Sequence, residues 1–191
     1  HEQFHLRSVA DLEQRIQELG LNLEVREDIS PLLETVRIGS FTLPNRLVVL
    51  PMEGCDGLAD GSPDELTIRR YRRFAAGGAG LLWFEATAVV PEARANPRQL
   101  WIHEGNWGSF ARLADMSRDE ARGAAGPNHT PLLVLQLTHS GRYSKPGRAP
   151  APIIAHRSKF LDPIHKLGPD YPLISDDELE RLEDQYVAAA R

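Results

Sequence analysis

Cysteine and excess positive charge are both scarce in this sequence. Cys55 is the single cysteine among 191 residues, which excludes an internal disulfide framework and zinc ribbons built from CxxC pairs. A reducing, cytoplasmic setting is therefore expected. The 22 Lys and Arg residues against 27 Asp and Glu residues give a net charge of −5, which disfavours a nucleic-acid-binding surface.

Long hydrophobic runs and several common motifs are also missing. The longest apolar stretches, residues 46–52 and 80–85, are far too short to span a bilayer, so no membrane association is expected. No G-x-G-x-x-G follows a strand, and there is no P-loop, G-x-S-x-G or H-E-x-x-H motif. The seven histidines show no metal-site spacing on a helix, so no metal is predicted.

What is present is a succession of short apolar strands and amphipathic helices. Strands are predicted at residues 46–52, 80–86 and 131–137, each followed by a loop and a helical segment. Nearly wholly apolar strands separated by helices are typical of a parallel sheet with both faces covered. A complete barrel of eight such units usually needs about 250 residues, more than this chain has.

Capping signals mark where the helices begin. Ser62-Pro63-Asp64-Glu65 is interpreted as a capping box with Ser62 as N-cap, and the helix carries an apolar stripe of Ile68, Tyr71 and Ala75 before Gly77-Gly78 ends it. A second helix is predicted near Asn106, with Trp107, Phe110, Leu113 and Ala114 on one face. A third is predicted after Ser175, with Leu179, Leu182 and Tyr186 on one face.

The N-terminal segment is predicted to be a helical extension. Ser8 is a plausible N-cap, Leu12, Ile16 and Leu19 repeat at helical spacing, and Gly20 ends the run. An apolar stripe of this kind usually serves packing, so the helix is expected to lie on the main body. Residues 36–43 alternate apolar and polar side chains around Gly39-Ser40, which predicts a β-hairpin.

Polar clusters follow each of the three predicted strands, at residues 51–55, 85–88 and 136–142. Functional groups in parallel α/β folds gather at the carboxyl ends of strands, so these clusters predict a site. Cys55 is expected to be inert because Glu53 and Asp56 would raise its pKa. His139 is equally consistent with a hydrogen-bonded loop residue and with a site residue.

Three segments resemble motifs of the Old Yellow Enzyme family, the NADH:flavin oxidoreductases. Residues 45–52 resemble the first barrel strand of that family, and residues 78–89 its second strand. Residues 136–142, Gln-Leu-Thr-His-Ser-Gly-Arg, resemble its third-strand motif, and the predicted hairpin looks like the one that closes the bottom of its barrel. The resemblance covers residues 33–191.

The resemblance implies an α/β fold of the (β/α)8 TIM barrel type, with FMN at the carboxyl rim. Hydride would pass from NAD(P)H to the flavin and then to a small-molecule acceptor, often an alkene activated by a carbonyl. The implied cofactor contacts are Pro51 and Met52 along the isoalloxazine, Glu53 beside its reactive edge, Ala86 on the ring and Gln136 on the pyrimidine side. Cys55, His139 and Arg142 are the substrate-side candidates.

Two departures from the family pattern stand out. Glu53 occupies a position that is commonly Thr or Cys, and a carboxylate there would lower the flavin potential unless it is protonated. The family's substrate-anchoring pair and phosphate clamp come later in its order than this sequence extends. About three β/α units are therefore expected, with residues 1–32 as the helical extension and residues 33–191 as the N-terminal portion of the FMN-binding barrel.

Two other functions remain open at this point. The chain could be a non-catalytic half-barrel, or a subunit that completes the barrel of a partner chain or of a second copy in a homo-oligomer. A barrel enzyme of another class, such as a hydrolase or aldolase, is disfavoured because there is no metal cluster. Lys145, Lys159 and Lys166 all lie in the long loop, which leaves no obvious lysine nucleophile.

Overall fold

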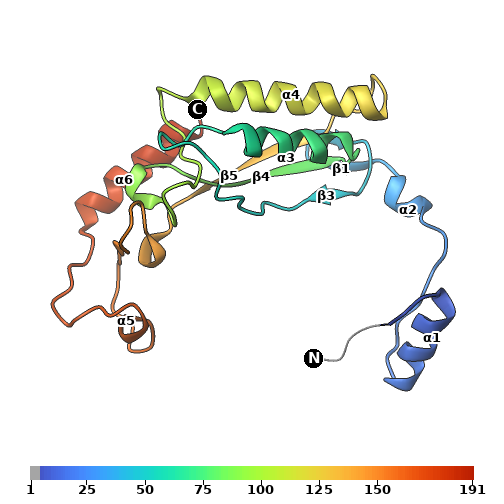
Figure 1. Cartoon of the computed structure of the whole chain (residues 1–191), viewed down its shortest axis with the longest axis horizontal. Helices are drawn as coiled ribbons and strands as arrows, with labels where there is room; N and C mark the ends of the chain where they lie inside the picture. The colour runs from blue at the N-terminus through green and yellow to red at the C-terminus, as the bar shows by residue number, and fades with distance from the viewer. Residues whose placement is uncertain (1–4) are drawn as a thin grey trace.

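A computed structural model describes residues 5–191, which form an open parallel sheet with two helices on one face (Figure 1). The strands are β3 (Val48–Val49), β4 (Leu81–Ala88) and β5 (Leu132–Thr138), in the spatial order β3-β4-β5. The helices α3 (Glu65–Ala76) and α4 (Trp107–Ala125) connect them. The parallel pairing of the strands was predicted correctly, but the expectation that both faces are covered was wrong. Within the described residues the sheet does not close into a barrel, and only one of its faces is covered.

The core lies between this sheet and the two helices. β4 is the central strand, and its Leu82 and Phe84 point into two clusters of buried side chains. Leu82 is 0% exposed and packs with Ala75 of α3 and Ala121 of α4. Because the helices pack on a single face, alternate residues of the strands point away from the core.

β3 is shorter and more exposed than predicted. Only Val48 and Val49 form the ladder, whereas a buried strand was expected over residues 46–52. Leu47, Leu50 and Met52 are exposed. The reason is that β3 is hydrogen-bonded to β4 alone, so its outer edge and the side chains on the bare face meet no other element of the described chain.

The helix boundaries differ in detail from the capping signals. Asp64, not Ser62, caps α3, and its carboxylate accepts a hydrogen bond from the Glu65 amide. Ser62 is instead buried and bonded to Asp60. Thr67 takes the buried position expected for Ile68, because the loop after β3 packs against this side of the helix. Gly77 ends α3 as predicted.

The other two predicted helices are present. Asn106 is the N-cap residue of α4, whose Phe110 and Leu113 are buried, while Trp107 is 64% exposed and was wrongly assigned to the buried face. Ser175 and Glu178 form the capping box of α6 (Asp176–Ala189), whose predicted stripe is half-buried. Short helical turns η1 (Pro91–Ala93), η2 (Gly141–Tyr143) and α5 (Leu161–Ile164) lie in the loops.

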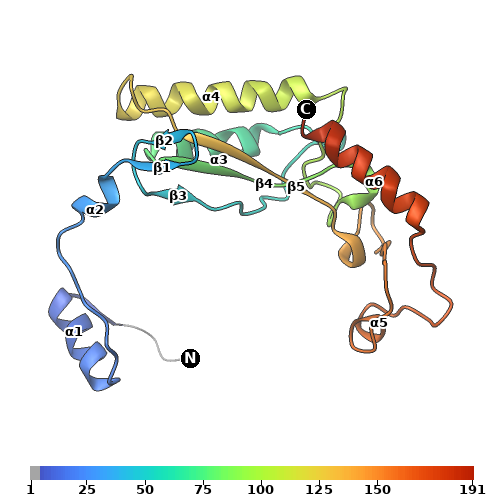
Figure 2. The ribbon, with the colours of Figure 1, turned by 180° about the vertical axis from the view of Figure 1, so that it is seen from behind.

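The N-terminal segment extends away from the sheet. α1 (Val9–Glu18) begins after the predicted N-cap Ser8, which forms a capping box with Asp11, but none of the residues of α1 is buried. Figures 1 and 2 show it separated from the main body, joined through a linker and α2 (Ser30–Leu33). The expectation that its apolar stripe packs on the body was wrong. The hairpin of β1 (Val36–Ile38) and β2 (Phe41–Leu43) is confirmed.

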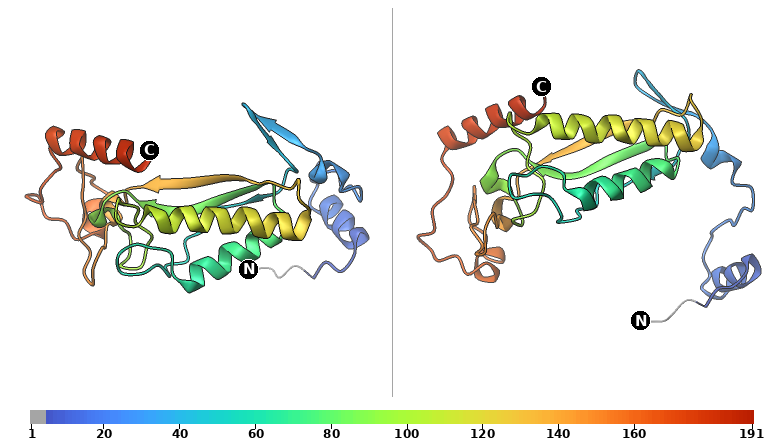
Figure 3. Two further views of the ribbon diagram at one scale, coloured as in Figure 1. Left: turned by 90° about the horizontal axis from the view of Figure 1, so that it is seen from above. Right: turned by 45° about the horizontal axis from the view of Figure 1, so that its top comes forward.

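The two ends of the sheet are occupied differently. The amino ends of the strands adjoin the hairpin and the N-terminal arm. The carboxyl ends adjoin η1, the long loop and α6, which extends beyond the sheet (Figure 3). Of the helices described, none combines the length and apolar character needed to cross a membrane.

Candidate functional site

The three polar clusters predicted from the sequence meet at the carboxyl ends of the strands. The Gly54 amide donates a hydrogen bond of 2.9 Å to Glu85, which joins the loop after β3 to the end of β4. The Val89 amide donates to the Thr138 carbonyl at 3.2 Å, and the Ser140 amide to the Ala93 carbonyl at 2.8 Å. The second and third segments are thereby joined as well.

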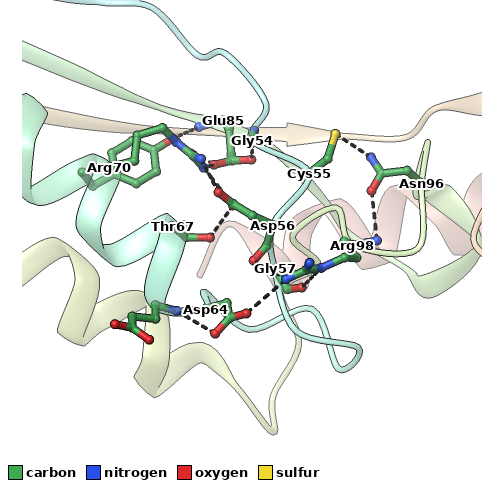
Figure 4. A network of polar contacts seen from close by, with 12 residues as sticks. Gly54, Cys55, Asp56, Gly57, Asp64, Thr67, Arg70, Glu85, Asn96 and Arg98 are labelled. Atoms are coloured by element: carbon green, nitrogen blue, oxygen red, sulfur yellow. Dashed lines mark hydrogen bonds and ion pairs between the residues drawn. The ribbon is translucent and has the colours of Figure 1, made fainter.

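Arg70 is the centre of a polar network that holds the first of these loops (Figure 4). Its guanidinium donates to both carboxylate oxygens of Asp56, at 2.5 and 3.1 Å. The same guanidinium donates to Oε1 of Glu85. Thr67 donates to Asp56 at 2.6 Å. One helical side chain therefore ties the loop after β3 to the neighbouring strand β4.

Glu85 is a buried member of this network, with a side chain that is 1% exposed. Its amide donates to the Tyr71 hydroxyl at 2.6 Å, and that hydroxyl lies 3.4 Å from Oε1 of the same residue. The ladder with β5 shifts register between Phe84 and Thr87. Such a bulge lets consecutive side chains, Phe84 and Glu85, both reach α3.

The charges in the network shift several pKa values. Burial alone would raise the pKa of Asp56, but hydrogen bonds from Arg70 and Thr67 and the guanidinium charge outweigh it and lower the pKa. The pKa of Tyr71 is raised, chiefly by burial and then by the charge of Glu85. The pKa of Glu53 is raised by partial burial and by the charge of Glu85. Glu53 is thus easier to protonate than an ordinary glutamate.

This network was missed by sequence reasoning. Arg70 stands in a run of four arginines around Tyr71, which looks like an ordinary solvated helix face. One signal was available: Thr67, Arg70 and Tyr71 share one side of the helix, at spacings of three and four residues. Their partners Asp56 and Glu85 belong to other elements, and the sequence alone does not indicate that pairing.

The predicted flavin contacts are distributed over this rim. Leu133 and Leu135 of β5 pack toward the helices, so Gln136 belongs to the opposite, bare face together with Trp83 of β4, which is 38% exposed. Met52 and Glu53 are exposed in the loop after β3. Ala86 is buried, and its carbonyl accepts a hydrogen bond from the Gln99 side chain.

Gln136 suits a flavin in its chemistry. Its side-chain amide makes no hydrogen bond with any residue in the described range 5–191. An amide that offers both a donor and an acceptor matches the edge of a pyrimidine ring. The bare face beside it carries an indole and apolar side chains, which suit a planar ring system. These residues therefore fit FMN, although the individual contacts remain predictions.

Cys55 lies on the loop that Arg70 holds. Its thiol is exposed and accepts a hydrogen bond from the Asn96 side chain at 3.2 Å. Its pKa is raised, first by partial burial and then by the charges of Glu53, Glu85 and Asp56. This agrees with the expectation of an unreactive thiol. The residue also has a φ of 51°, a left-handed conformation that is unusual for a side chain other than glycine.

His139 and Arg142 have separate environments. The Nδ1 atom of His139 accepts a hydrogen bond from the Gly141 amide at 2.9 Å, and burial lowers the pKa of its imidazole. Arg142 is ion-paired with Asp162 and donates to the His156 carbonyl at 2.8 Å. Its side chain is only 8% exposed, so this guanidinium orders the long loop and is not available to a substrate in this arrangement.

A cavity of about 560 Å³ adjoins His139. It is bounded by η1, the long loop and residues 178–185 of α6, and its charged lining residues are Glu92, Glu178 and Arg181. Among residues 5–191, no group of three or more His, Cys, Asp or Glu side chains is arranged to hold a metal ion.

Comparisons with known proteins agree on one family. No protein-family model matches the chain. The NADPH dehydrogenase of Halalkalibacterium halodurans is 33% identical over 132 residues, which cover 65% of this chain and 36% of that protein. The solved Old Yellow Enzyme homologue from Zymomonas mobilis is 25% identical, with a TM-score of 0.58 over 83% of this chain. The resemblance to the Old Yellow Enzyme family is confirmed.

The fold of the Old Yellow Enzyme family is matched only in part. Old Yellow Enzyme from Pichia sp. AKU4542 has a TM-score of 0.65 at 19% identity, a likeness that concerns the fold alone. The chain covers 42% of that structure and 44% of the Zymomonas mobilis homologue. It thus spans less than half the length of each of these proteins.

Proposed function

We propose that this chain contributes the first three β/α units of an FMN-binding (β/α)8 barrel in an NAD(P)H-dependent oxidoreductase of the Old Yellow Enzyme type. The observation that carries the proposal is the arrangement of residues at the carboxyl ends of the strands. Gln136 of β5 has an unpartnered side-chain amide on the bare face of the sheet. The loop after β3 is hydrogen-bonded to the end of β4, the strand next to β5. The 33% identity to an NADPH dehydrogenase supports it.

The residues of this chain would hold and orient the cofactor. Bound FMN supplies the hydride chemistry between the nicotinamide donor and the acceptor. Gln136 would bind the pyrimidine edge, and the backbone at Pro51 and Met52 would lie along the ring. Glu53 would stand at the reactive edge, where a negative charge on its carboxylate would lower the potential of the bound flavin. The pKa of this carboxyl group is raised, first by partial burial and then by the charge of Glu85. Ala86 would underlie the ring.

The substrate side is expected at Cys55 and His139. Both lie at the carboxyl ends of the strands, and the half-buried His139 borders the cavity. Arg142, the third candidate, is engaged with Asp162 and would act on the substrate only through the order of the long loop. The acceptor we propose is an unsaturated or other small organic molecule, and a cytoplasmic location is part of the same proposal.

The remaining barrel half would cover the bare face of the sheet. β3 and β5 each have one edge without a neighbouring strand among the described residues, and unpaired strand edges seek partners. The missing half would come from the same longer chain, from another chain or from a second copy. The open edges also support the alternative, a non-catalytic half-barrel that completes a partner's barrel.

Titration of the purified chain with FMN, followed by flavin fluorescence, separates the two functions. The oxidoreductase proposal expects saturable quenching that weakens about tenfold in Gln136→Leu, the effect of losing a hydrogen bond worth about 1–1.5 kcal/mol. Gln17→Leu, on the exposed surface of α1, is the matched control and should bind as the wild type does. Absence of any binding would favour the half-barrel.

A further inference from the structure

We propose that Arg70 is a positioning residue for the flavin site: it holds residues 53–57 against β4 and so sets the place of Glu53. This inference rests on the proposed function, since it assigns a task within the same site. Arg70 belongs to α3, on the helix side of the sheet, and acts only through Glu85 and Asp56.

The geometry requires a forked cation at this position. One guanidinium nitrogen serves Asp56 alone, and the other donates to both Asp56 and Glu85. The second oxygen of Glu85 is left to accept the Gly54 amide. A lysine ammonium has no planar fork and cannot reproduce a bidentate pair while reaching a second carboxylate.

The path of the loop is fitted to this side chain. A Cβ atom built on Gly54 would lie 1.9 Å from Nη1 of Arg70, so the backbone passes directly over the guanidinium. The next residue, Cys55, adopts its left-handed conformation immediately after that contact. Backbone strain of this kind persists where the surroundings hold the chain in place, and Arg70 with its two carboxylates supplies that constraint.

Charge explains why the loop depends on Arg70. Glu53, Asp56 and Glu85 place three carboxyl groups around one short segment. After burial, which is the larger cause, the charge of Glu85 raises the pKa of Glu53, and the charges of all three carboxyl groups raise the pKa of Cys55. Arg98, the other nearby cation, bonds the carbonyls of Asp56 and Gly57 and the carboxylate of Asp64. Figure 4 shows it on the opposite side of Asp56 from Glu85. Without Arg70, Glu85 therefore loses its cationic partner.

The test compares Arg70→Met and Arg70→Lys with Arg73→Met, a matched control one turn further along the same helix. Arg73 is exposed and forms no side-chain hydrogen bond or ion pair within the described residues. The first readout is amide hydrogen exchange of the peptide that contains residues 53–57. The second is the rate at which a disulfide reagent modifies Cys55, the single thiol of the chain. The third is FMN binding and the absorption spectrum of the bound flavin.

We expect Arg70→Met to lose exchange protection at Gly54 and to speed modification of Cys55 by about tenfold, because the loosened loop carries the thiol out of its partial burial and away from Glu85, and its pKa falls. FMN affinity should fall by about tenfold or more, with a shifted spectrum for the remaining bound flavin. Arg70→Lys should recover the overall stability but only part of the affinity. Arg73→Met should match the wild type in all three readouts.

Two outcomes would overturn the inference. Unchanged exchange and thiol reactivity in Arg70→Met would mean that Arg70 does not hold the loop. A loosened loop with unchanged FMN affinity and spectrum would reduce Arg70 to a structural residue. Failure of the wild-type chain to bind FMN is a different result: it contradicts the proposed function, while exchange and thiol modification still decide whether Arg70 holds the loop.

Discussion

At the scale of single residues, the carboxyl groups around the loop after β3 are the distinctive feature. Glu85 lies close enough to Glu53 for its charge to raise the pKa of Glu53. Glu85 and Asp56 are ion-paired with Arg70, whereas Glu53 is not. Despite its burial, the pKa of Asp56 is lowered by its hydrogen bonds from Arg70 and Thr67, whereas the pKa of the unpaired Glu53 is raised, first by partial burial and then by the charge of Glu85. The two kinds of carboxyl group should therefore respond to substitution and to pH in opposite ways.

Replacing Glu53 should change the flavin potential. In Glu53→Thr we expect the midpoint potential of bound FMN to rise by on the order of tens of millivolts at neutral pH, because a negative charge near the reduced flavin is removed. Potentiometric titration of the wild type and the variant measures this shift. Glu53→Gln, which keeps the size of the side chain, should show the same rise. Equal potentials in all three proteins would contradict the role assigned to this carboxyl group.

Asp56 should stabilise the fold at neutral pH and lose this effect at strongly acidic pH. Its pKa is lowered in the folded chain, so its contribution is present above the unfolded value of about 3.9 and is lost as the pH falls through the folded value. Asp56→Asn should cost about 1–3 kcal/mol at pH 7, the worth of hydrogen bonds to a charged group. Urea unfolding at pH 7 and at pH 3 tests this expectation, because the difference between variant and wild type should shrink at the lower pH.

At the scale of elements, the most local signals were the most accurate. The N-caps Ser8 and Ser175, the Gly77 helix end and the hairpin around Gly39 are all present where the sequence placed them. These features depend on hydrogen bonds and backbone preferences within a few residues. The errors concern burial: α1 does not pack on the body, β3 is exposed, and Ser62 is displaced as a cap by Asp64.

Removing the cap of α1 should have a strictly local effect. Ser8→Ala removes a side-chain hydrogen bond from the Asp11 amide and should weaken the helix by about 1 kcal/mol. Because no residue of α1 is buried, faster amide exchange should be confined to that helix. The comparison variant is Ser175→Ala, which removes the N-cap of α6, a helix that lines the cavity. Faster exchange in the sheet of Ser8→Ala would show that α1 does contact the body.

At the scale of the whole molecule, the chain is a sheet covered on one face, with an N-terminal arm, the segment that carries α1, extending away from it. Helices α3 and α4 cover one face, while the other face and two strand edges meet no element among the described residues. The two clusters of buried side chains lie on the helix side of the sheet, and among the described residues α1 contributes no buried side chain. Stability should therefore reside in residues beyond the arm.

Deletion of residues 1–27 should leave the unfolding of the body unchanged. The contacts that tie the segment after residue 27 to the body include the hydrogen bond from the Arg46 amide to the Leu32 carbonyl and the ion pair of Arg46 with Glu34. Both remain in the shortened chain. The free energy of unfolding from urea titration should agree within about 0.5 kcal/mol. A larger loss would mean that the arm contributes to the core.

The sequence by itself determined the order of elements, most of the turns and caps, and the family resemblance, because each depends on residues close together in the chain. It also located the rim, since strand ends are local features. Only the tertiary structure decided which rim residues touch. Arg70 meets partners 14 and 15 residues away on two other elements, and Arg142 turns to Asp162. Such pairings depend on how the layers pack, which no local pattern encodes.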